Sequence, residues 1–145
     1  MLAARRISRR RSCLTAWPRG WVARRREIAQ RYDAAFAGMS AVQPLAVRPD
    51  VVHACHLYMV RVKSQEIGLS RTQVFATVRA EGIGINVHYI SLHLHPFYRK
   101  CFGTGPGLCP VAEKAYEDLI TLLVFPAMSD DDVEAVVTSV ASVVK

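Results

Sequence analysis

Long apolar runs are missing from this chain of 145 residues. No window approaches the roughly 18 consecutive apolar residues that a membrane-spanning helix needs. The N-terminal region also lacks the apolar core of a secretory signal, because its longest uncharged stretch is Ser12–Pro18. We therefore expect a cytoplasmic protein that has no membrane partner.

Cysteine is scarce and shows no recognisable spacing. The chain has four cysteines, and Cys101 and Cys109 are separated by seven residues, which is not a usual zinc-ligand spacing. In a chain without an export signal, reduced thiols are the default. We interpret all four cysteines as structural or incidental and expect no disulfide.

Acidic residues are absent from residues 1–26, which carry nine arginines, whereas residues 27–145 carry 12 acidic and 10 basic residues. An N-terminal leader, residues 1–19, carries six of these arginines and so supplies +6 of the net charge of +7. Such a leader is typical of an organelle transit peptide or of an arm that binds anions or nucleic acid. We favour a third interpretation, a disordered or mis-called start, and we do not expect a nucleic-acid partner.

Hydrophobic periodicity and turn residues divide the remainder into alternating elements. Ser70 and Ser129 are suitable N-caps for two of the helices. The pattern predicts a small α+β domain, with two or three mostly antiparallel strands and helices packed on one face. The predicted elements are helices over 20–37, 71–80, 111–123 and 129–144, strands over 53–62 and 84–90, a short extended piece over 124–127, an extended linker over 40–50 and an irregular stretch over 91–110.

The five histidines fall into two clusters that could suggest a metal site. His53 and His56 would project to opposite faces of a strand, however, and neither a carboxylate nor a patterned cysteine accompanies either cluster. The sequence also has no nucleophile elbow around Ser91, and the glycines of 103–107 lack the lysine of a phosphate-binding loop. We therefore predict no metal site and no catalytic residue of these kinds.

A dense group of polar and aromatic residues remains, at the end of the second predicted strand and in the stretch after it. Hydrogen-bonding rings beside one cation are suited to a hydroxyl-rich ligand that bears phosphates. In the alternative interpretation, the tyrosines anchor the core and the arginine caps a helix. The group consists of His88, Tyr89, His93, Pro96, Tyr98 and Arg99.

The run HYISLHLHPFY, at residues 88–98, lies within a longer patterned segment, Arg71–Lys100. On this run and three further stretches, residues 20–145 resemble the C-terminal part of the DegT/DnrJ/EryC1/StrS aminotransferases, and within them the transaminases of the pseudaminic-acid pathway, which aminate a UDP-linked 4-keto sugar. The segment Arg71–Lys100 contains the most specific part, the family pattern H-Y-x-P-x-H-x-x-P-x-Y, with Ser91 in place of the first proline. The supporting stretches are WVARRREIAQRYDAAF, HLYMVRV and CPVAEKAYEDLITLLVFPAMSDDDVEAVV.

The resemblance implies the small C-terminal domain of a fold-type I aminotransferase, at 20–145. Family members hold pyridoxal 5'-phosphate (PLP) on a lysine of an N-terminal domain, and none of the four lysines here has that sequence context. The resemblance thus implies a chain that binds no PLP alone and is inactive alone. Its partners would be a nucleotide sugar, an amino-acid donor, and a second copy or a separate N-terminal domain. The implied substrate-binding residues are His88, Tyr89, His93 and Tyr98.

The sequence leaves one other function open. A non-catalytic binding or regulatory protein could carry the same domain and use the basic leader to bind nucleic acid or another anion.

Overall fold

The structure, a computed structural model, describes residues 20–144. The leader, Cys13 and Lys145, on which some sequence predictions fall, lie outside this range. Residues 20–36 form a helix, and the other elements follow in the order β1 (Val42–Pro44), β2 (Tyr58–Val62), α2 (Ser64–Ile67), α3 (Arg71–Ala80), η1 (Leu92–Leu94), α4 (Pro96–Phe102), α5 (Pro110–Asp118), β3 (Leu119–Leu122) and α6 (Asp130–Val143).

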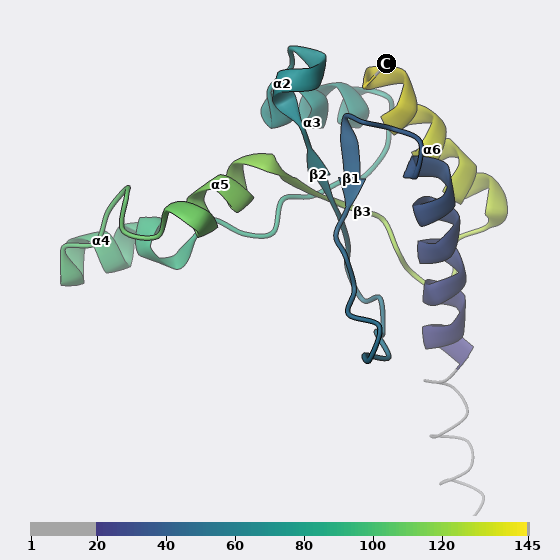
Figure 1. Cartoon of the computed structure of the whole chain (residues 1–145), viewed down its shortest axis with the longest axis horizontal. Helices are drawn as coiled ribbons and strands as arrows, with labels where there is room; N and C mark the ends of the chain where they lie inside the picture. The colour runs from purple at the N-terminus through teal and green to yellow at the C-terminus, as the bar shows by residue number, and fades with distance from the viewer. Residues whose placement is uncertain (1–19, 145) are drawn as a thin grey trace, which may run out of the picture.

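The three strands form one antiparallel sheet in the order β1-β2-β3 (Figure 1). Val42 pairs with Val62, and Tyr58 pairs with Leu122. Because alternate side chains of a strand project to opposite faces, one face of the sheet is apolar and faces the core. Helix 20–36, α3 and α6 pack on that face, so the predicted α+β class and the antiparallel sheet are confirmed. The buried core includes Ile28, Tyr32, Phe36, Val60, Val62, Val74, Val78, Ile120, Val136 and Val140.

Two helices begin where the sequence predicts. The Ser70 hydroxyl accepts a hydrogen bond from the Gln73 amide, and the Gln73 side chain accepts one from the Ser70 amide. Ser129 and Asp132 form the same reciprocal pair at the start of α6. Each capping box satisfies two backbone groups that the first turn of a helix would otherwise leave unpaired.

Other predicted elements are wrong in extent. The predicted strand over 84–90 is reduced to a single bridge, in which Asn86 pairs with Thr121, and the chain then leaves the sheet. The predicted strand over 53–62 begins only at Tyr58, because Cys55 has a φ of 47° and the chain turns there. The predicted linker over 40–50 contributes β1.

The C-terminal part of the predicted helix over 111–123 is a strand. Helix α5 ends at Asp118, and the next four residues form β3 and pair with β2. The β-branched residues Ile120 and Thr121 suit an extended strand, and pairing with β2 buries this segment, so tertiary contacts prevail over helical periodicity.

Residues 91–118 project from the body as an arm that contains η1, α4 and α5 (Figure 1). The stretch predicted to be irregular, 91–110, therefore contains two short helices. Arg71, at the start of α3, donates hydrogen bonds to the carbonyls of Tyr116 and Glu117 and lies 5.3 Å from the centre of the Tyr116 ring. These contacts hold the C-terminal end of α5 against the body.

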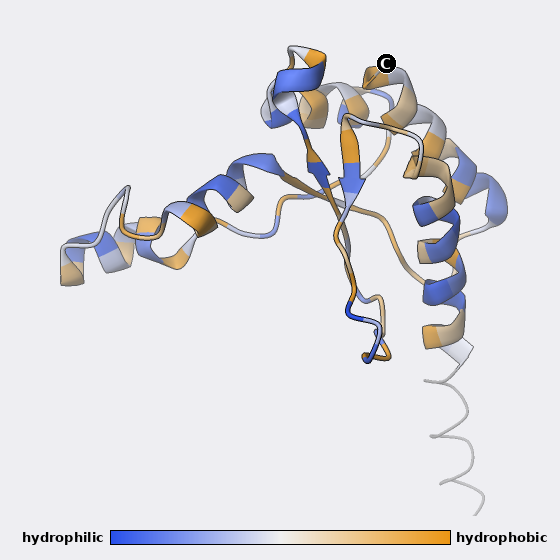
Figure 2. Ribbon diagram, in the orientation of Figure 1, coloured by the Kyte–Doolittle hydropathy of each residue, from blue (hydrophilic) through white to orange (hydrophobic). Residues whose placement is uncertain are grey.

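Hydrophobic residues, orange in Figure 2, occur on the strands and the helices beside them and also along the arm. Several large apolar residues of the arm are exposed, including Leu92, Phe97, Phe102, Leu108 and Val111. Within residues 20–144, no helix is long and apolar enough to cross a membrane.

Candidate functional site

His88 lies beside β3, the strand whose residues were predicted to be helical. Ile120 and Leu122 of β3 are buried in the core, so Thr121 between them projects from the opposite face of the sheet. The Thr121 hydroxyl oxygen lies 2.8 Å from Nδ1 of His88. This bond occupies one ring nitrogen and leaves Nε2 of His88 available for another partner.

Tyr89 follows directly and points into solvent. Its side chain is 73 % exposed, and its ring meets the His88 ring edge-on with the centres 4.5 Å apart. The Tyr89 hydroxyl has no hydrogen-bond partner among the residues that the structure describes. An exposed phenol beside a half-buried imidazole presents two polar groups to a ligand.

His93 lies in the arm and is nearly buried, with 9 % of its surface exposed. Its Nε2 lies 2.8 Å from a carboxylate oxygen of Glu113, and its backbone carbonyl accepts a hydrogen bond from the Thr104 hydroxyl. Only Nδ1 of His93 remains for a ligand. In the chain by itself, His93 therefore holds η1 against α5.

Glu113 organises the turn between α4 and α5. Its carboxylate accepts hydrogen bonds from the amides of Gly107, at 2.9 and 3.0 Å, and Cys109, at 3.2 Å. The Gly107 amide and then His93 lower the pKa of this carboxyl group below its usual value. Glu113 therefore stays ionised, which keeps all three donors satisfied.

Tyr98 belongs to a group of aromatic rings on α4. Its ring stacks on Phe102, with the centres 5.9 Å apart, and meets Phe97 and His95 edge-on. The side chain is half-buried, and its hydroxyl has no partner within residues 20–144. Tyr98 thus offers a ligand one hydroxyl group at the outer part of the arm.

The predicted site residues therefore divide between two places. His88 and Tyr89 touch each other beside β3, whereas His93 and Tyr98 lie in the arm; no hydrogen bond or ring contact in the described chain joins the two pairs. Sequence reasoning missed Thr121 and Glu113, which orient the two histidines. Glu113 stands in the P-x-A-E part of the last resembling stretch, and that position was the available signal.

The described residues contain neither a set of metal ligands nor a lysine suited to PLP. Among residues 20–144, no group of three or more histidine, cysteine, aspartate or glutamate side chains could hold a metal ion. Cys55, Cys101 and Cys109 are free thiols.

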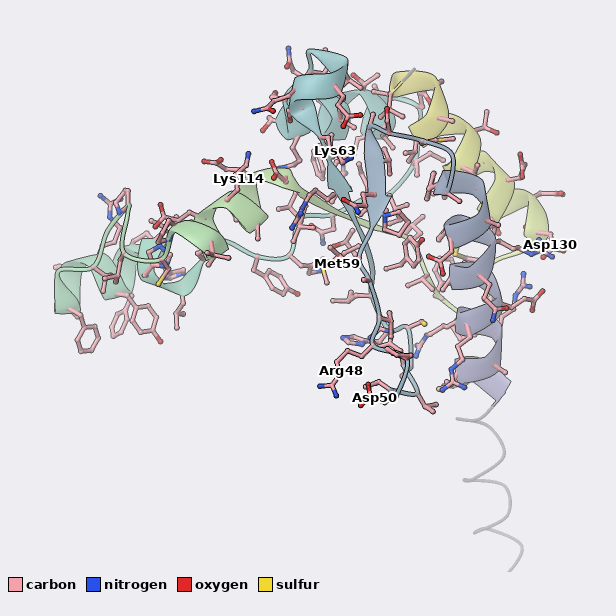
Figure 3. All side chains as sticks on the ribbon, in the orientation of Figure 1. Arg48, Asp50, Met59, Lys63, Lys114 and Asp130 are labelled. Carbon is pink, nitrogen blue, oxygen red and sulfur yellow. The ribbon has the colours of Figure 1, made fainter. Side chains whose placement is uncertain are left out.

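A lysine that carries PLP is normally enclosed in the cofactor pocket, where desolvation lowers its pKa. Lys114 is instead exposed and Lys63 is half-buried (both labelled in Figure 3), and they form ion pairs with Asp118 and Glu66. Lys100 is exposed on α4. None of the three described lysines fits the role, so no step through PLP is derived from this chain.

Comparisons with known proteins identify the family and the fold. Residues 18–141 match the profile of the DegT/DnrJ/EryC1/StrS aminotransferase family. The chain is 40 % identical over 121 residues to the uncharacterized protein MJ1066 of Methanocaldococcus jannaschii, covering 83 % of this chain and 31 % of that protein. It is 38 % identical over 123 residues to the spore coat polysaccharide biosynthesis protein SpsC of Bacillus subtilis, covering 84 % and 32 %.

Solved structures show the same fold. The apo-form of the putative sugar aminotransferase Spr1654 from Streptococcus pneumoniae superposes with a TM-score of 0.78 at 32 % identity, over 87 % of this chain and 31 % of that one. The aminotransferase PseC of Helicobacter pylori superposes with a TM-score of 0.77 over 86 % and 33 %, and at 22 % identity this likeness concerns the fold alone. The chain spans about a third of the length of these proteins.

Proposed function

The chain belongs to the DegT/DnrJ/EryC1/StrS aminotransferase family, and we propose that it is the sugar-binding C-terminal part of a PLP-dependent enzyme. The enzyme would transfer an amino group from an amino-acid donor, glutamate in the simplest case, to the keto carbon of a nucleotide-linked deoxy sugar. The relative SpsC takes part in spore coat polysaccharide biosynthesis, which supports a product used in a surface polysaccharide or other glycan.

The observation that carries this proposal is the set of unpartnered polar groups on a family domain. Within residues 20–144, the hydroxyls of Tyr89 and Tyr98 and Nε2 of His88 have no hydrogen-bond partner, while Thr121 holds the other ring nitrogen of His88. Such groups bind sugar hydroxyls and phosphate oxygens by hydrogen bonds and orient the sugar. The proton transfers of the reaction are assigned to the lysine of the cofactor-bearing domain and not to these residues.

The proposal assigns PLP to another polypeptide segment. PLP would supply the electron sink for the amino transfer. Lys63 and Lys114 are each paired with a carboxylate, which supports a chain that is inactive by itself. A lysine-bearing domain, on a separate chain or within a homodimer, would complete it. The exposed apolar residues of the arm, Phe97 and Phe102 among them, would then be covered by that partner.

The finer substrate proposal is a UDP-linked 4-keto sugar of the kind aminated in the pseudaminic-acid pathway. Its support is the pattern of His88, Tyr89, His93 and Tyr98 within Arg71–Lys100. Hydrogen bonds to hydroxyl and phosphate groups contact the sugar and the phosphates but not the base. The site is therefore expected to discriminate between sugars more strongly than between nucleotides.

The test is reconstitution. The purified chain is incubated with PLP, alone and with a separately expressed N-terminal domain of a family enzyme, and the visible absorbance of lysine-bound cofactor is recorded before and after borohydride reduction. Amino transfer from glutamate to a UDP-linked 4-keto sugar is measured in the same samples. We expect a reducible chromophore and activity only in the mixture.

A reducible chromophore with the chain alone would contradict the assignment of PLP to another segment. Absence of activity in the mixture, in spite of a stable complex that binds PLP, would contradict the proposed reaction.

A further inference from the structure

We propose that the pocket beside the end of β3 is an oxyanion site, in which Arg79, His56 and His88 bind a carboxylate or phosphate group of a substrate. The identity of the ligand rests on the proposed function, whereas the binding of an oxyanion does not. Arg79 and His56 were not among the residues that the sequence predicted.

The pocket has a volume of about 410 Å³ and is built from four separate segments. His56 precedes β2, Arg79 lies in the last turn of α3, Asn86 and His88 follow α3, and Thr121–Phe125 belongs to β3 and the residues after it. Among the described residues, 20–144, no aspartate or glutamate lines it. Its charged and titratable groups are therefore all basic.

Arg79 is partly fixed before any ligand binds. Its guanidinium carbon lies 5.6 Å from the centre of the Phe75 ring, and one terminal nitrogen donates to the Ile85 carbonyl at 3.4 Å. The remaining donors of the guanidinium have no partner in the part of the chain that the structure describes, and the residue is exposed. A held guanidinium with free donors suits a planar carboxylate or a phosphate.

The two histidines can supply further donors. His88 is oriented by Thr121 through Nδ1, which leaves Nε2. The ring of His56 has no hydrogen-bond partner within residues 20–144, and its side chain is exposed. Two imidazoles from different segments, together with a guanidinium and without a carboxylate among the lining residues, form a site for negative charge rather than for a cation.

Two sources could supply the oxyanion, the phosphate of the nucleotide sugar or the carboxylate of the amino-acid donor. The experiment separates them. The ring resonances of all five histidines of the full chain are followed by NMR while inorganic phosphate, UDP or glutamate is added at constant pH and ionic strength, with chloride as reference. Phosphate or UDP binding tighter than glutamate assigns the site to the nucleotide sugar; the reverse assigns it to the donor.

We expect saturable shifts of His56 and His88 that are larger than those of His53, His93 and His95. Arg79→Gln should weaken this binding by about tenfold, since the lost contact is a charge-assisted hydrogen bond. Arg61→Gln is the matched control, because it removes the same charge from an exposed residue of β2 that does not line the pocket. Arginines of the leader are present in both variants and cannot account for a difference between them.

The inference is overturned if none of the three anions produces saturable shifts, if all five histidines shift in parallel, or if Arg79→Gln and Arg61→Gln bind alike. Because the test measures binding by the chain alone, failure of the reconstituted transaminase would not affect it. Conversely, an active reconstituted enzyme with an unaltered Arg79→Gln titration would reject the oxyanion site and leave the proposed function in place.

Discussion

Nε2 of His93 lies 2.8 Å from a carboxylate oxygen of Glu113, which is 20 residues further along the chain. The same carboxylate accepts hydrogen bonds from the backbone amides of Gly107 and Cys109. One side chain of α5 therefore closes the turn of the arm and fixes the ring of a predicted substrate-binding residue. A histidine held in this way has a defined ring orientation before substrate arrives, which lowers the entropic cost of binding.

Replacing Glu113 with alanine should loosen the arm and leave the body folded. The amides of Gly107 and Cys109 lose their acceptor, so their hydrogen exchange, followed by NMR, should accelerate several-fold, whereas amides of α6 should be unaffected. Glu117→Ala is the control, because the carboxylate of Glu117 makes only an exposed contact with Lys114 at 4.0 Å. Equal exchange in both variants would show that Glu113 does not hold the turn.

Acid should destabilise α6 and its contact with helix 20–36. The hydrogen bond from Arg24 is the main cause that lowers the pKa of Asp130, and the Ser129 amide lowers that of Asp132. A lowered folded-state pKa gives stability that is present above the unfolded-state pKa, about 4 for aspartate, and that is lost as the pH falls further. Urea midpoints should therefore be level above about pH 5 and fall below about pH 4.

The Asp132→Asn variant should lose less stability at acid pH than the unmodified chain. Asp131→Asn is the matched control on the same turn. If the urea midpoint of Asp132→Asn falls with pH as it does in the unmodified chain, the Asp132 carboxylate does not contribute to the acid destabilisation.

The two capping serines should contribute similar stability. Ser70→Ala and Ser129→Ala each remove the side-chain acceptor of a capping box and should lower the free energy of unfolding by about 1 kcal/mol. Thr138→Ala, at an exposed interior position of α6, should instead be neutral or stabilise by about 0.5 kcal/mol, because alanine has the higher helix propensity. Chemical denaturation checks all three; a loss in Thr138→Ala equal to that in Ser129→Ala would contradict the role of the caps.

The hydroxyls of Tyr32 and Tyr98 should contribute differently to stability. Tyr32 is fully buried and donates to the Leu123 carbonyl at 2.9 Å, so Tyr32→Phe should cost about 1–2 kcal/mol of stability. The Tyr98 hydroxyl has no partner in the described chain, so Tyr98→Phe should change stability by less than about 0.5 kcal/mol. In the reconstituted enzyme, Tyr98→Phe should raise KM for the sugar nucleotide. A stability loss in Tyr98→Phe with an unchanged KM would assign this tyrosine to packing.

Local signals predicted the parts of the fold that depend on local interactions. Ser70 and Ser129 define the starts of α3 and α6 because a capping box involves residues only three positions apart. The four-residue spacing of Ile28, Tyr32 and Phe36 predicts the buried face of helix 20–36 for the same reason. The α+β class also followed from the order of elements.

The prediction errors lie where contacts between segments distant in the sequence determine the structure. Residues 119–122 have a helical pattern together with 111–118, and pairing with β2 makes them a strand. Residues 84–90 have the composition of a strand, but only Asn86 finds a partner. The histidines of the candidate site were predicted, whereas their partners Thr121 and Glu113 were not, because hydrogen bonds across 33 and 20 residues leave no periodic trace in the sequence.

Helix α5 and strand β3 follow each other without an intervening residue: Asp118 ends the helix and Leu119 begins the strand. Their junction is held by Arg71, whose donors reach the last carbonyls of α5. The arm and the sheet are therefore mechanically coupled. A contact that turns the arm must rotate β3 or break the last turn of α5, and Thr121, which orients His88, lies three residues beyond that turn.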